Sequence, residues 1–322
     1  MPDKKKIFAQ LDVTNMCNNN CIFCDNKEIS ATKYFISMSA VEKHLGYMAE
    51  QGATSLILTG GEPTTHPELP AIVNKAVNKN FREIVLHTNG RNLGKSDLSQ
   101  KLSDSGVNNV MVSLFGDSTP VHESISRRNG SFAETLEGIR AWSKTENYLC
   151  INTPITTKNY ICLMDIAKLI ESMELKKYRW QISDLYPTTA VLKSSSQQVE
   201  YSALKPILHE TIKLCIIHNI RYSTQEIPLC ILFPWIKEAQ ELSINGVSCI
   251  LVVDSSHENG YRKIRPWSSV NKLFPAMCNT CSMKNACSGI SKSYLKQYDD
   301  LEALHPFSYV YAKDLRKMIA RS

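Results

Sequence analysis

The chain has 322 residues, of which 43% are hydrophobic and 21% charged, the balance of an ordinary globular protein. No apolar run reaches the ~18 residues that a membrane helix needs, and a strand-like segment rather than an apolar signal core follows the basic start, so a cytoplasmic protein without a membrane partner is expected. The net charge of +6 is mild, a solvated surface explains it, and without a long Lys/Arg block it does not favour a nucleic-acid partner.

Apolar strands and amphipathic helices alternate over the first part of the chain. Strands are predicted at 7–13, 54–60, 82–90, 108–116, 148–156 and 177–186. Helices are predicted between them at 39–52, 68–79, 97–106, 131–144 and 161–173. This alternation indicates a parallel sheet with helical crossovers, either open or a partial barrel, and both arrangements place functional loops at the carboxyl ends of the strands.

The rhythm changes after residue 186. A polar connector and a long amphipathic helix (201–219) fill residues 187–219. Residues 220–322 hold short strand-like pieces, several prolines and a group of cysteines, which suggests a smaller C-terminal subdomain that relies on metal more than on a large core. The predicted divisions are therefore 1–186, 187–219 and 220–322.

Cysteine is the most informative residue type. Six of the 11 cysteines form two tight groups, Cys17, Cys21 and Cys24, then Cys278, Cys281 and Cys287. In a reducing compartment such groups bind metal more often than they form disulfides. Three thiolates can hold a four-iron cubane and leave one iron free for a ligand. The structural alternative for the first group is a zinc knuckle, which usually needs a fourth Cys or His at short spacing, and none lies nearby.

The first group, with Phe23 directly before its last cysteine, resembles the signature of the radical S-adenosylmethionine (SAM) superfamily. The resemblance makes Phe23 a candidate cofactor contact. The segment LTGGEP at 58–63 resembles the Gly-Gly-Glu-Pro motif of that family, which holds the amino group of SAM and falls here on Gly60, Gly61, Glu62 and Pro63. A glycine pair lets the backbone approach a ligand closely, and a carboxylate accepts from an ammonium. The two motifs follow successive strands in the family's order, which makes the resemblance specific.

Further resemblance extends over residues 7–185 and implies a partial (β/α)6 barrel. The stretch HTNG places Asn89 at the end of the third strand, where the resemblance makes it a candidate cofactor contact, and VSLFG places Ser113 where relatives contact the ribose or carboxylate of SAM. Phe115 stands where the family often has Asp, so no role is carried over to it. Arg127 and Arg128 are candidates for the SAM carboxylate, with surface arginines as the alternative, and Asn152 is a candidate contact for adenosine.

The resemblance also implies the chemistry. SAM would chelate the free iron of a [4Fe-4S] cluster, and an electron from a flavodoxin- or ferredoxin-type donor would break its C5′–S bond. The resulting 5′-deoxyadenosyl radical would abstract a hydrogen atom from the substrate. The protein would position the reactants and exclude water and oxygen.

The second cysteine group resembles the auxiliary-cluster regions called SPASM and twitch domains. The remaining cysteines are too few for two further clusters, so one auxiliary [4Fe-4S] cluster is expected. Its fourth ligand would be Cys230 or Cys249, and Cys230 is favoured because a Pro-x-Cys turn exposes a side chain better than an apolar strand does. Cys249 could instead return a hydrogen atom to a substrate radical, as in some peptide epimerases of the family, or be a buried structural cysteine. A structural zinc site is the alternative for the whole group.

Several functions remain open at this point. A peptide or a small molecule would be the substrate, in the manner of peptide and natural-product maturation. A sugar, a nucleoside or tRNA are alternatives. A zinc-stabilised binding module without catalysis is the alternative from another class, and the Gly-Gly-Glu-Pro match argues against it, because such a module has no use for a SAM amino-group site.

Overall fold

The computed structural model of the protein describes residues 6–24, 33–185, 191, 197–243, 247–253, 261–264, 272–298 and 301–307. The chain divides into two compact units. Unit 1 comprises Met1–Asn152, Met173–Arg179 and Gly246–Ser268, and unit 2 comprises Thr153–Ser172, Trp180–Asn245 and Ser269–Ser322. The division expected at residue 186 lies outside the described residues, and the three-part division stays a prediction.

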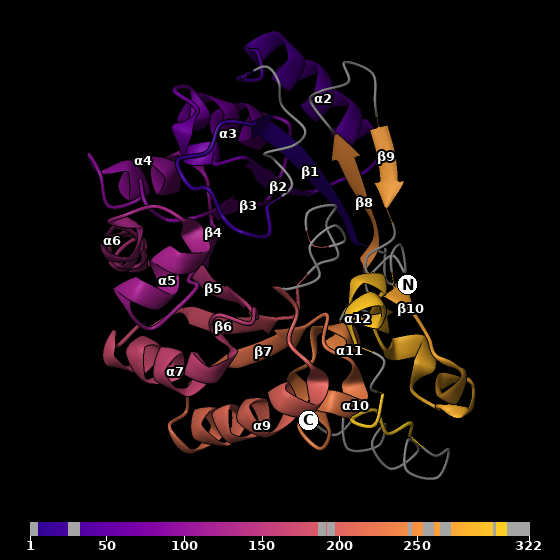
Figure 1. Ribbon diagram of the computed structural model, residues 1–322. Helices are drawn as coiled ribbons and strands as arrows, with labels where there is room; N and C mark the ends of the chain where they lie inside the picture. The colour runs from indigo at the N-terminus through magenta and orange to yellow at the C-terminus, as the bar shows by residue number, and fades with distance from the viewer. Residues whose placement is uncertain are drawn as a thin grey trace. The chain divides into compact units, whose positions relative to one another are not determined.

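Unit 1 is built on a sheet in the order β5-β4-β3-β2-β1-β8-β9. Its strands are β1 (Lys6–Thr14), β2 (Ser55–Gly60), β3 (Glu83–Thr88), β4 (Asn109–Ser113), β5 (Tyr148–Pro154, whose last two residues belong to unit 2), β8 (Val247–Val253) and β9 (Tyr261–Ile264). Neighbouring strands from β5 to β8 are parallel, and β9 is antiparallel to β8. The carboxyl ends of β1 to β5 therefore lie along one edge, as Figure 1 shows.

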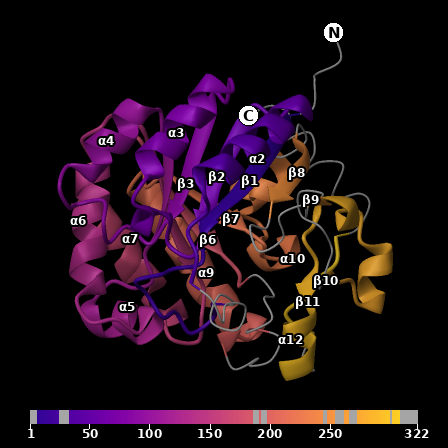
Figure 2. The same ribbon diagram turned by 90° about the horizontal axis from the view of Figure 1, so that it is seen from above.

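Alternating apolar residues explain the strands of unit 1. In β1, Ala9, Leu11 and Val13 are fully buried, in agreement with the two-residue period of a strand. The core continues through Leu56 and Leu58 of β2. The covering helices are α2 (Met38–Glu50), α3 (Leu69–Asn78), α4 (Leu98–Ser105), α5 (Thr119–Ser126) and α6 (Ser131–Ser143). Helices α2, α3, α4 and α6 lie on the outer side of the strands (Figures 1 and 2).

Unit 2 carries the second cysteine group. Its elements are α7 (Leu163–Ser172), most of β6 (Tyr178–Ser183), α9 (Tyr201–Ile217), β7 (Tyr222–Gln225), α10 (Leu229–Leu232), α11 (Gln240–Ser243), β10 (Lys272–Leu273), β11 (Ile290–Ser291) and α12 (Lys292–Gln297). Strands β6 and β7 are parallel, and β10 and β11 form an antiparallel hairpin. Helix α9 buries Leu204, Leu208, Ile212 and Cys215 at helical spacing, as its amphipathic pattern predicts.

The strands and helices expected between residues 7 and 183 are present within a few residues of their predicted bounds. Helix α5 was not predicted, because Pro120 and a run of polar residues hide its apolar stripe. The pairing of β8 with β1 was not predicted either, since an apolar strand carries no local signal of its partner. Among the described strands, no pairing closes a barrel.

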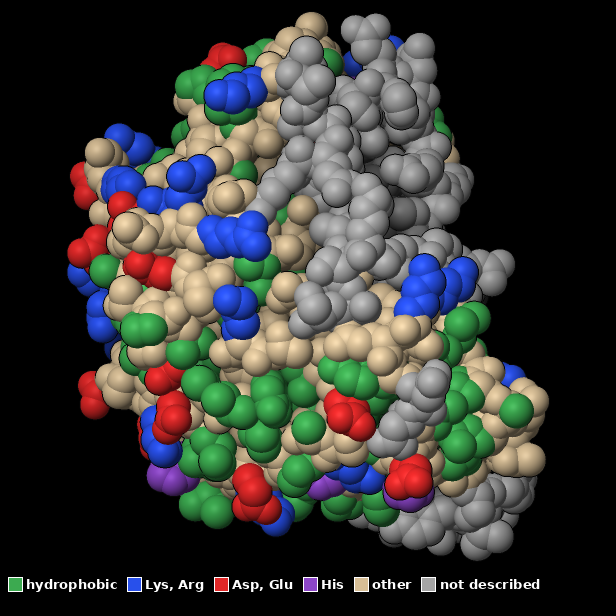
Figure 3. All heavy atoms as spheres, in the orientation of Figure 1, with side chains coloured by type: hydrophobic (Ala, Val, Ile, Leu, Met, Phe, Trp, Pro, Cys, Tyr) green, Lys and Arg blue, Asp and Glu red, His purple; other side chains and the backbone are tan. Residues whose placement is uncertain are grey.

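No feature of the described surface indicates a particular kind of partner. No helix of the described part is both long and apolar enough to cross a membrane. On the face drawn in Figure 3, basic and acidic side chains are both spread over the described part rather than separated into one patch each. This distribution agrees with a solvated surface as the explanation of the mild positive charge.

Candidate active site

The three cysteines of the first group lie in the loop that follows β1, and this loop is fastened to the end of α5. The backbone N–H of Asn20 donates to the Ser126 carbonyl at 2.9 Å, and that of Ile22 donates to the Ile125 carbonyl at 3.0 Å. Within the loop, the N–H of Cys24 donates to the Cys21 carbonyl at 3.3 Å. Helix α5 therefore fixes the course of the cysteine loop.

The glycine pair packs directly against the chain that leads into this loop. The N–H of Gly61 donates to the Thr14 carbonyl at 2.6 Å, and the N–H of Glu62 donates to the Met16 carbonyl at 2.7 Å. A Cβ on Gly60 would lie 2.2 Å from the Thr14 oxygen, and one on Gly61 would lie 2.3 Å from the Met16 oxygen. Only glycine permits this approach, so the pair sets the position of the residue before Cys17.

Gly61→Ala is expected to destabilise the protein by about 1–3 kcal/mol, because the backbone must move to admit the methyl group. Gly46→Ala in α2 is the matched control, since a Cβ there meets nothing within 4 Å. The control should leave stability unchanged or raise it by up to about 1 kcal/mol. Urea unfolding of the metal-free protein measures both, and equal midpoints would contradict the tight approach.

Glu62 is a buried carboxylate at the centre of the site. Its side chain is 1% exposed, and Oε1 accepts from the Thr64 N–H at 3.1 Å, the Thr64 hydroxyl at 2.6 Å and the Thr88 hydroxyl at 2.6 Å. Oε2 accepts from the Asn89 N–H at 2.6 Å. Burial raises the pKa of Glu62 above its usual value. Because every donor is neutral, the ionised carboxylate has no counter-charge among these partners, and Oε2 can accept a further bond from an ammonium.

Asn89 joins this carboxylate to the cysteine loop. Its Nδ2 donates to Oδ1 of Asn18 at 2.6 Å and makes a longer contact of 3.9 Å with the Cys17 sulfur. Its Oδ1 accepts from the Arg91 N–H at 3.1 Å, which holds the side chain in this orientation. One short network therefore runs from Glu62 to Cys17, and Asn89, predicted as a cofactor contact, bridges the two motifs.

Cys17 has the most open side chain of the three loop cysteines, yet its sulfur is largely desolvated by neighbouring atoms. The pKa of the Cys17 thiol is raised to about 11, mainly by this desolvation and to a smaller extent by the charges of Glu62 and Cys24, while the Asn19 N–H at 3.4 Å acts to lower it. The free thiol is thus protonated near neutral pH. A metal centre that binds here must displace the proton, which is the usual linkage for thiolate ligands.

Arg91 fixes the cysteine loop from the other side, and sequence reasoning missed it. Its Nη1 donates to the Asn18 carbonyl and, at 3.0 Å, to Oδ1 of Asn19. Its Nε forms an ion pair with Glu134. The position directly after HTNG was the only signal that could have pointed to it. Arg91 therefore links the cysteine loop to Glu134 of α6.

Phe23 and Phe115 form an aromatic contact behind the loop. Their ring centroids are 5.6 Å apart in an edge-on arrangement. The Phe115 ring lies 5.1 Å from the ring of His122, and the Phe115 N–H donates to His122 Nδ1 at 3.2 Å. Burial lowers the pKa of His122 to about 4, so this histidine is neutral near pH 7. Phe115, at the position where relatives often have Asp, therefore belongs to the packing that supports the loop.

The remaining predicted contacts divide into two groups. Ser113 and Asn152 face each other in the register of β4 and β5, half-buried at the carboxyl edge of the sheet. Arg127 ends α5 with a left-handed φ of 53°, and both it and Arg128 are exposed. Neither arginine forms an ion pair within the described part of the chain. The structure therefore brings the two polar strand-end residues together and leaves the arginines at the surface.

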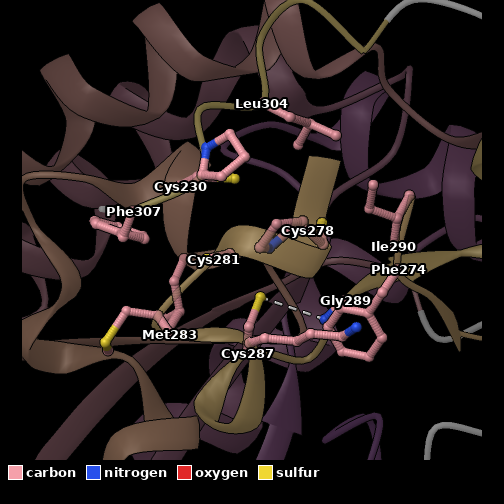
Figure 4. A pocket seen from close by; sticks show the side chains of 14 residues that line it. Cys230, Phe274, Cys278, Cys281, Met283, Cys287, Gly289, Ile290, Leu304 and Phe307 are labelled. Atoms are coloured by element: carbon pink, nitrogen blue, oxygen red, sulfur yellow. Dashed lines mark hydrogen bonds between the residues drawn. The ribbon is translucent and has the colours of Figure 1, made fainter. Parts of the chain in front are cut away.

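The second cysteine group surrounds a pocket of unit 2 together with Cys230, which comes from α10. Cys278, Cys281 and Cys287 come from the segment between β10 and β11, and Figure 4 shows these side chains around the pocket. The Gly289 N–H donates to the Cys287 sulfur at 3.4 Å. The other lining residues are mostly apolar: Pro228, Leu229, Phe274, Met283, Lys284, Gly289, Ile290, Leu304, Pro306 and Phe307. Four thiols in an apolar shell suit an iron–sulfur cluster as a donor set.

The four thiols are also electrostatically coupled. The pKa of Cys230 is raised to about 12, mainly by burial, and the charges of the other three cysteines contribute to that rise. Burial likewise raises the pKa of Cys278 and Cys287. Among the described residues, no three His, Cys, Asp or Glu side chains converge as they would on a single metal ion.

Cys249, the rival fourth ligand, lies on β8 of unit 1, with its Cα opposite Ile7 of β1. Its side chain is outside the described part, so its predicted role as a hydrogen donor stays a prediction. Cys150 and Cys215 are buried, as expected for structural thiols, and Cys162 is partly exposed.

Comparison with known proteins identifies the family. A family model described as the radical SAM superfamily matches residues 11–170, the part that holds the cysteine loop, the Glu62 network and the strand ends. This chain belongs to the radical SAM superfamily. Membership implies SAM and a [4Fe-4S] cluster as cofactors, and the three-thiol loop beside a buried carboxylate without a counter-charge fits that pair.

Several curated proteins are similar to this radical SAM protein over part of their length. An AdoMet-dependent heme synthase of Methanosarcina barkeri is 30% identical over 62% of this chain and 55% of its own. A probable GTP 3′,8-cyclase of Sulfolobus acidocaldarius is 25% identical over 65% of this chain and 66% of its own. The antilisterial bacteriocin subtilosin biosynthesis protein AlbA of Bacillus subtilis is 26% identical over 54% of this chain and 39% of its own. The chain thus spans about two fifths to two thirds of these relatives.

Solved structures share the fold. The enzyme anSMEcpe with bound AdoMet and the Kp18Cys peptide superposes with a TM-score of 0.69 at 15% identity, over 98% of this chain and 100% of that one. Streptococcus suis SuiB bound to S-adenosylmethionine superposes with a TM-score of 0.64 at 12% identity, over 95% of this chain and 77% of that one. At such identities the likeness concerns the fold alone. It confirms the predicted α/β class with an unclosed, barrel-like parallel sheet.

Proposed function

We propose that this protein cleaves SAM reductively at a [4Fe-4S] cluster held by Cys17, Cys21 and Cys24. The observation that carries the proposal is the network from Glu62 through Asn89 to Cys17, which puts a carboxylate able to accept an ammonium beside the thiol loop. SAM needs both at once, a partner for its amino group and a cluster within reach of its sulfonium. When bound, the reduced cluster supplies the electron that splits SAM into methionine and a 5′-deoxyadenosyl radical.

The residues of the chain would orient SAM and shield the reaction. Glu62 would accept from the ammonium through Oε2, with Thr64 and Thr88 holding its other oxygen. Ser113 and Asn152, half-buried at the strand ends, are proposed to contact the carboxylate or the ribose and adenine. The packing of Phe23 on Phe115 would exclude water behind the loop. Arg127 and Arg128 would contact the carboxylate only if their side chains turned inward from the surface.

We further propose that Cys230, Cys278, Cys281 and Cys287 hold one auxiliary [4Fe-4S] cluster. Support comes from the pocket that all four line and from their mutual effect on the Cys230 pKa. A flavodoxin- or ferredoxin-type donor and a cytoplasmic location complete the proposal, because both clusters need a reducing environment.

For the substrate we propose a peptide, with the radical removing one hydrogen atom from it. The support is the similarity to the subtilosin biosynthesis protein AlbA and the fold shared with SuiB and anSMEcpe, whose structures include complexes with peptides. A nucleotide is the second candidate, favoured by the similarity to a probable GTP 3′,8-cyclase.

The experiment starts from anaerobically reconstituted protein with dithionite and SAM. Formation of 5′-deoxyadenosine tests SAM cleavage, and about eight irons per chain test the two clusters. GTP and a peptide encoded beside the gene are then added separately. Stimulated 5′-deoxyadenosine release with a change in the peptide mass supports a peptide substrate, whereas stimulation by GTP alone supports the nucleotide. Colourless protein that contains only zinc would contradict the whole proposal.

Replacing Cys17, Cys21 and Cys24 together by Ala is expected to abolish 5′-deoxyadenosine formation and remove about four irons, since no other thiolates of that loop can hold the cluster. Replacing Cys150 and Cys162 by Ala is the control, because neither lies in the loop, and it should keep the iron. Iron and sulfide analysis with product quantification measures both. A full iron complement in the triple variant would show that the ligands are misassigned.

A further inference from the structure

A group of buried charged side chains lies in unit 2 at the carboxyl ends of β6 and β7. We call Asp184, Glu226, Glu241 and Lys272 the charge group. Asp184 directly follows β6 and Glu226 directly follows β7. Lys272 Nζ lies 2.9 Å from Glu226 Oε2 and donates to the Glu226 carbonyl at 3.3 Å, and the Lys272 side chain is only 2% exposed. A lysine buried so deeply requires an anionic partner.

The negative members of the charge group outnumber the positive one. Glu241 Oε1 accepts from the Glu226 N–H at 2.6 Å, whereas its Oε2 is buried without a partner among the described residues. Asp184 accepts from the Tyr201 hydroxyl at 2.8 Å and from the Leu185 N–H at 2.8 Å, and neither donor is charged. Three carboxylates therefore share one ammonium. When all are ionised, two negative charges lack a counter-charge within the group.

The charge group adjoins the cysteine pocket. Lys272 begins β10, and Phe274, two residues further on, lines the pocket. The Glu241 charge reaches Cys287 strongly enough to contribute to the raised pKa of that thiol. On the other flank, Tyr201, the hydrogen-bond partner of Asp184, is coupled electrostatically to Cys230. Cys287 and Cys230 thus both lie within electrostatic reach of this group.

We propose that the charge group lowers the reduction potential of the auxiliary cluster, with Glu241 as the largest contributor. The proposal rests on the auxiliary cluster proposed above. Reduction adds one electron, and buried negative charge opposes that addition more strongly than it would in water, because the surroundings screen it poorly. Charge and burial around a cluster are established determinants of its potential. The group would therefore favour the oxidised auxiliary cluster and make its reduced form a stronger electron donor.

The test is a potentiometric titration of the reconstituted full chain, followed by electron paramagnetic resonance, on Glu241→Gln. Glutamine keeps an oxygen that can accept from the Glu226 N–H, removes the charge, and puts a neutral amide nitrogen in place of Oε2. Burial raises the pKa of Glu241 to about 7, so the titration is run at pH 8.5, where the wild-type carboxylate is ionised. We expect the auxiliary cluster to shift to a more positive potential while the SAM-binding cluster of the same sample stays unchanged.

Glu210→Gln is the matched control, because this residue is exposed on α9 and forms a surface ion pair with Lys213. It should shift neither potential. Asp184→Asn removes a second buried charge. If Glu241→Gln fails to assemble the cluster, the auxiliary potential of Asp184→Asn tests the proposal instead. Wild-type protein with about four irons instead of eight would overturn the auxiliary cluster itself. A full iron complement with equal auxiliary potentials in wild type and both buried variants would overturn only the role of the charge group.

Discussion

Glu62→Gln is expected to weaken SAM binding by roughly 10- to 150-fold, because a hydrogen bond to a charged group contributes about 1.5–3 kcal/mol. The carboxylate is 1% exposed and all its described donors are neutral, so the SAM ammonium would be its only counter-charge. The amide of glutamine removes that charge. It also either turns an N–H donor toward the Asn89 N–H or breaks the bonds from Thr64 and Thr88. Equilibrium dialysis of SAM on reconstituted protein measures the loss.

Glu83→Gln is the matched control for this substitution. Glu83 accepts from the Ser55 hydroxyl at 2.7 Å, but it begins β3, whereas Thr88 and the site lie at the end of that strand. The control should bind SAM like the wild type, although it removes a carboxylate charge in the same way. Iron analysis of both variants shows whether the cluster is retained. If Glu62→Gln binds SAM as tightly as Glu83→Gln does, the ammonium is held elsewhere.

The sequence predicted the site best at positions where only a few residue types can perform the chemistry. Three thiolates at short spacing, a glycine pair and a carboxylate directly after a strand occur together in few kinds of site, and the structure places the carboxylate network beside the thiol loop. The glycine pair illustrates a limit. Its close approach was expected to be toward a ligand, whereas Gly61 and Glu62 direct their N–H groups to Thr14 and Met16 of the chain itself. The motif identifies the part of the backbone that makes a close approach, but it does not identify the group that is approached.

The residues that the sequence did not reveal act through long-range contacts. Arg91 and the carbonyls of Ile125 and Ser126 hold the cysteine loop across more than 70 residues of chain, and no periodicity encodes such a contact. The partner of β8 is similarly hidden, because an apolar strand fits any vacant edge. The charge group needs residues from four segments that are separate in sequence. Such sets follow from topology, which hydrophobic patterning specifies only coarsely.

Phe115 shows how a departure from a family pattern can be read. From the sequence alone, a phenylalanine at a position where the family often has Asp gave no reason to assign Phe115 a role. The structure shows the ring between Phe23 of the cysteine loop and His122 of α5. An aspartate there would place a charge in an apolar contact, at a cost of several kcal/mol unless it found a partner. The phenylalanine therefore fits a loop that is supported by packing at this point.

Cys230→Ala is expected to remove the auxiliary cluster and about four irons per chain, because three thiolates would then remain in a pocket that four line. The SAM-binding cluster should persist, since Cys17, Cys21 and Cys24 belong to the other unit. Dithionite and SAM should then still give 5′-deoxyadenosine, whereas conversion of substrate should stop. Iron and sulfide analysis, together with electron paramagnetic resonance of the reduced protein, measures the loss.

Cys249→Ala separates the two candidate ligands, because it deletes the same thiol from β8 and leaves the pocket intact. It should keep all of the roughly eight irons and both cluster signals. If Cys249 instead returns a hydrogen atom to the substrate radical, this variant should still consume SAM. Its product should then lack the returned hydrogen atom, which mass spectrometry of the substrate would detect. The assignment of Cys230 fails if the iron contents are reversed, with Cys230→Ala retaining both clusters and Cys249→Ala losing one.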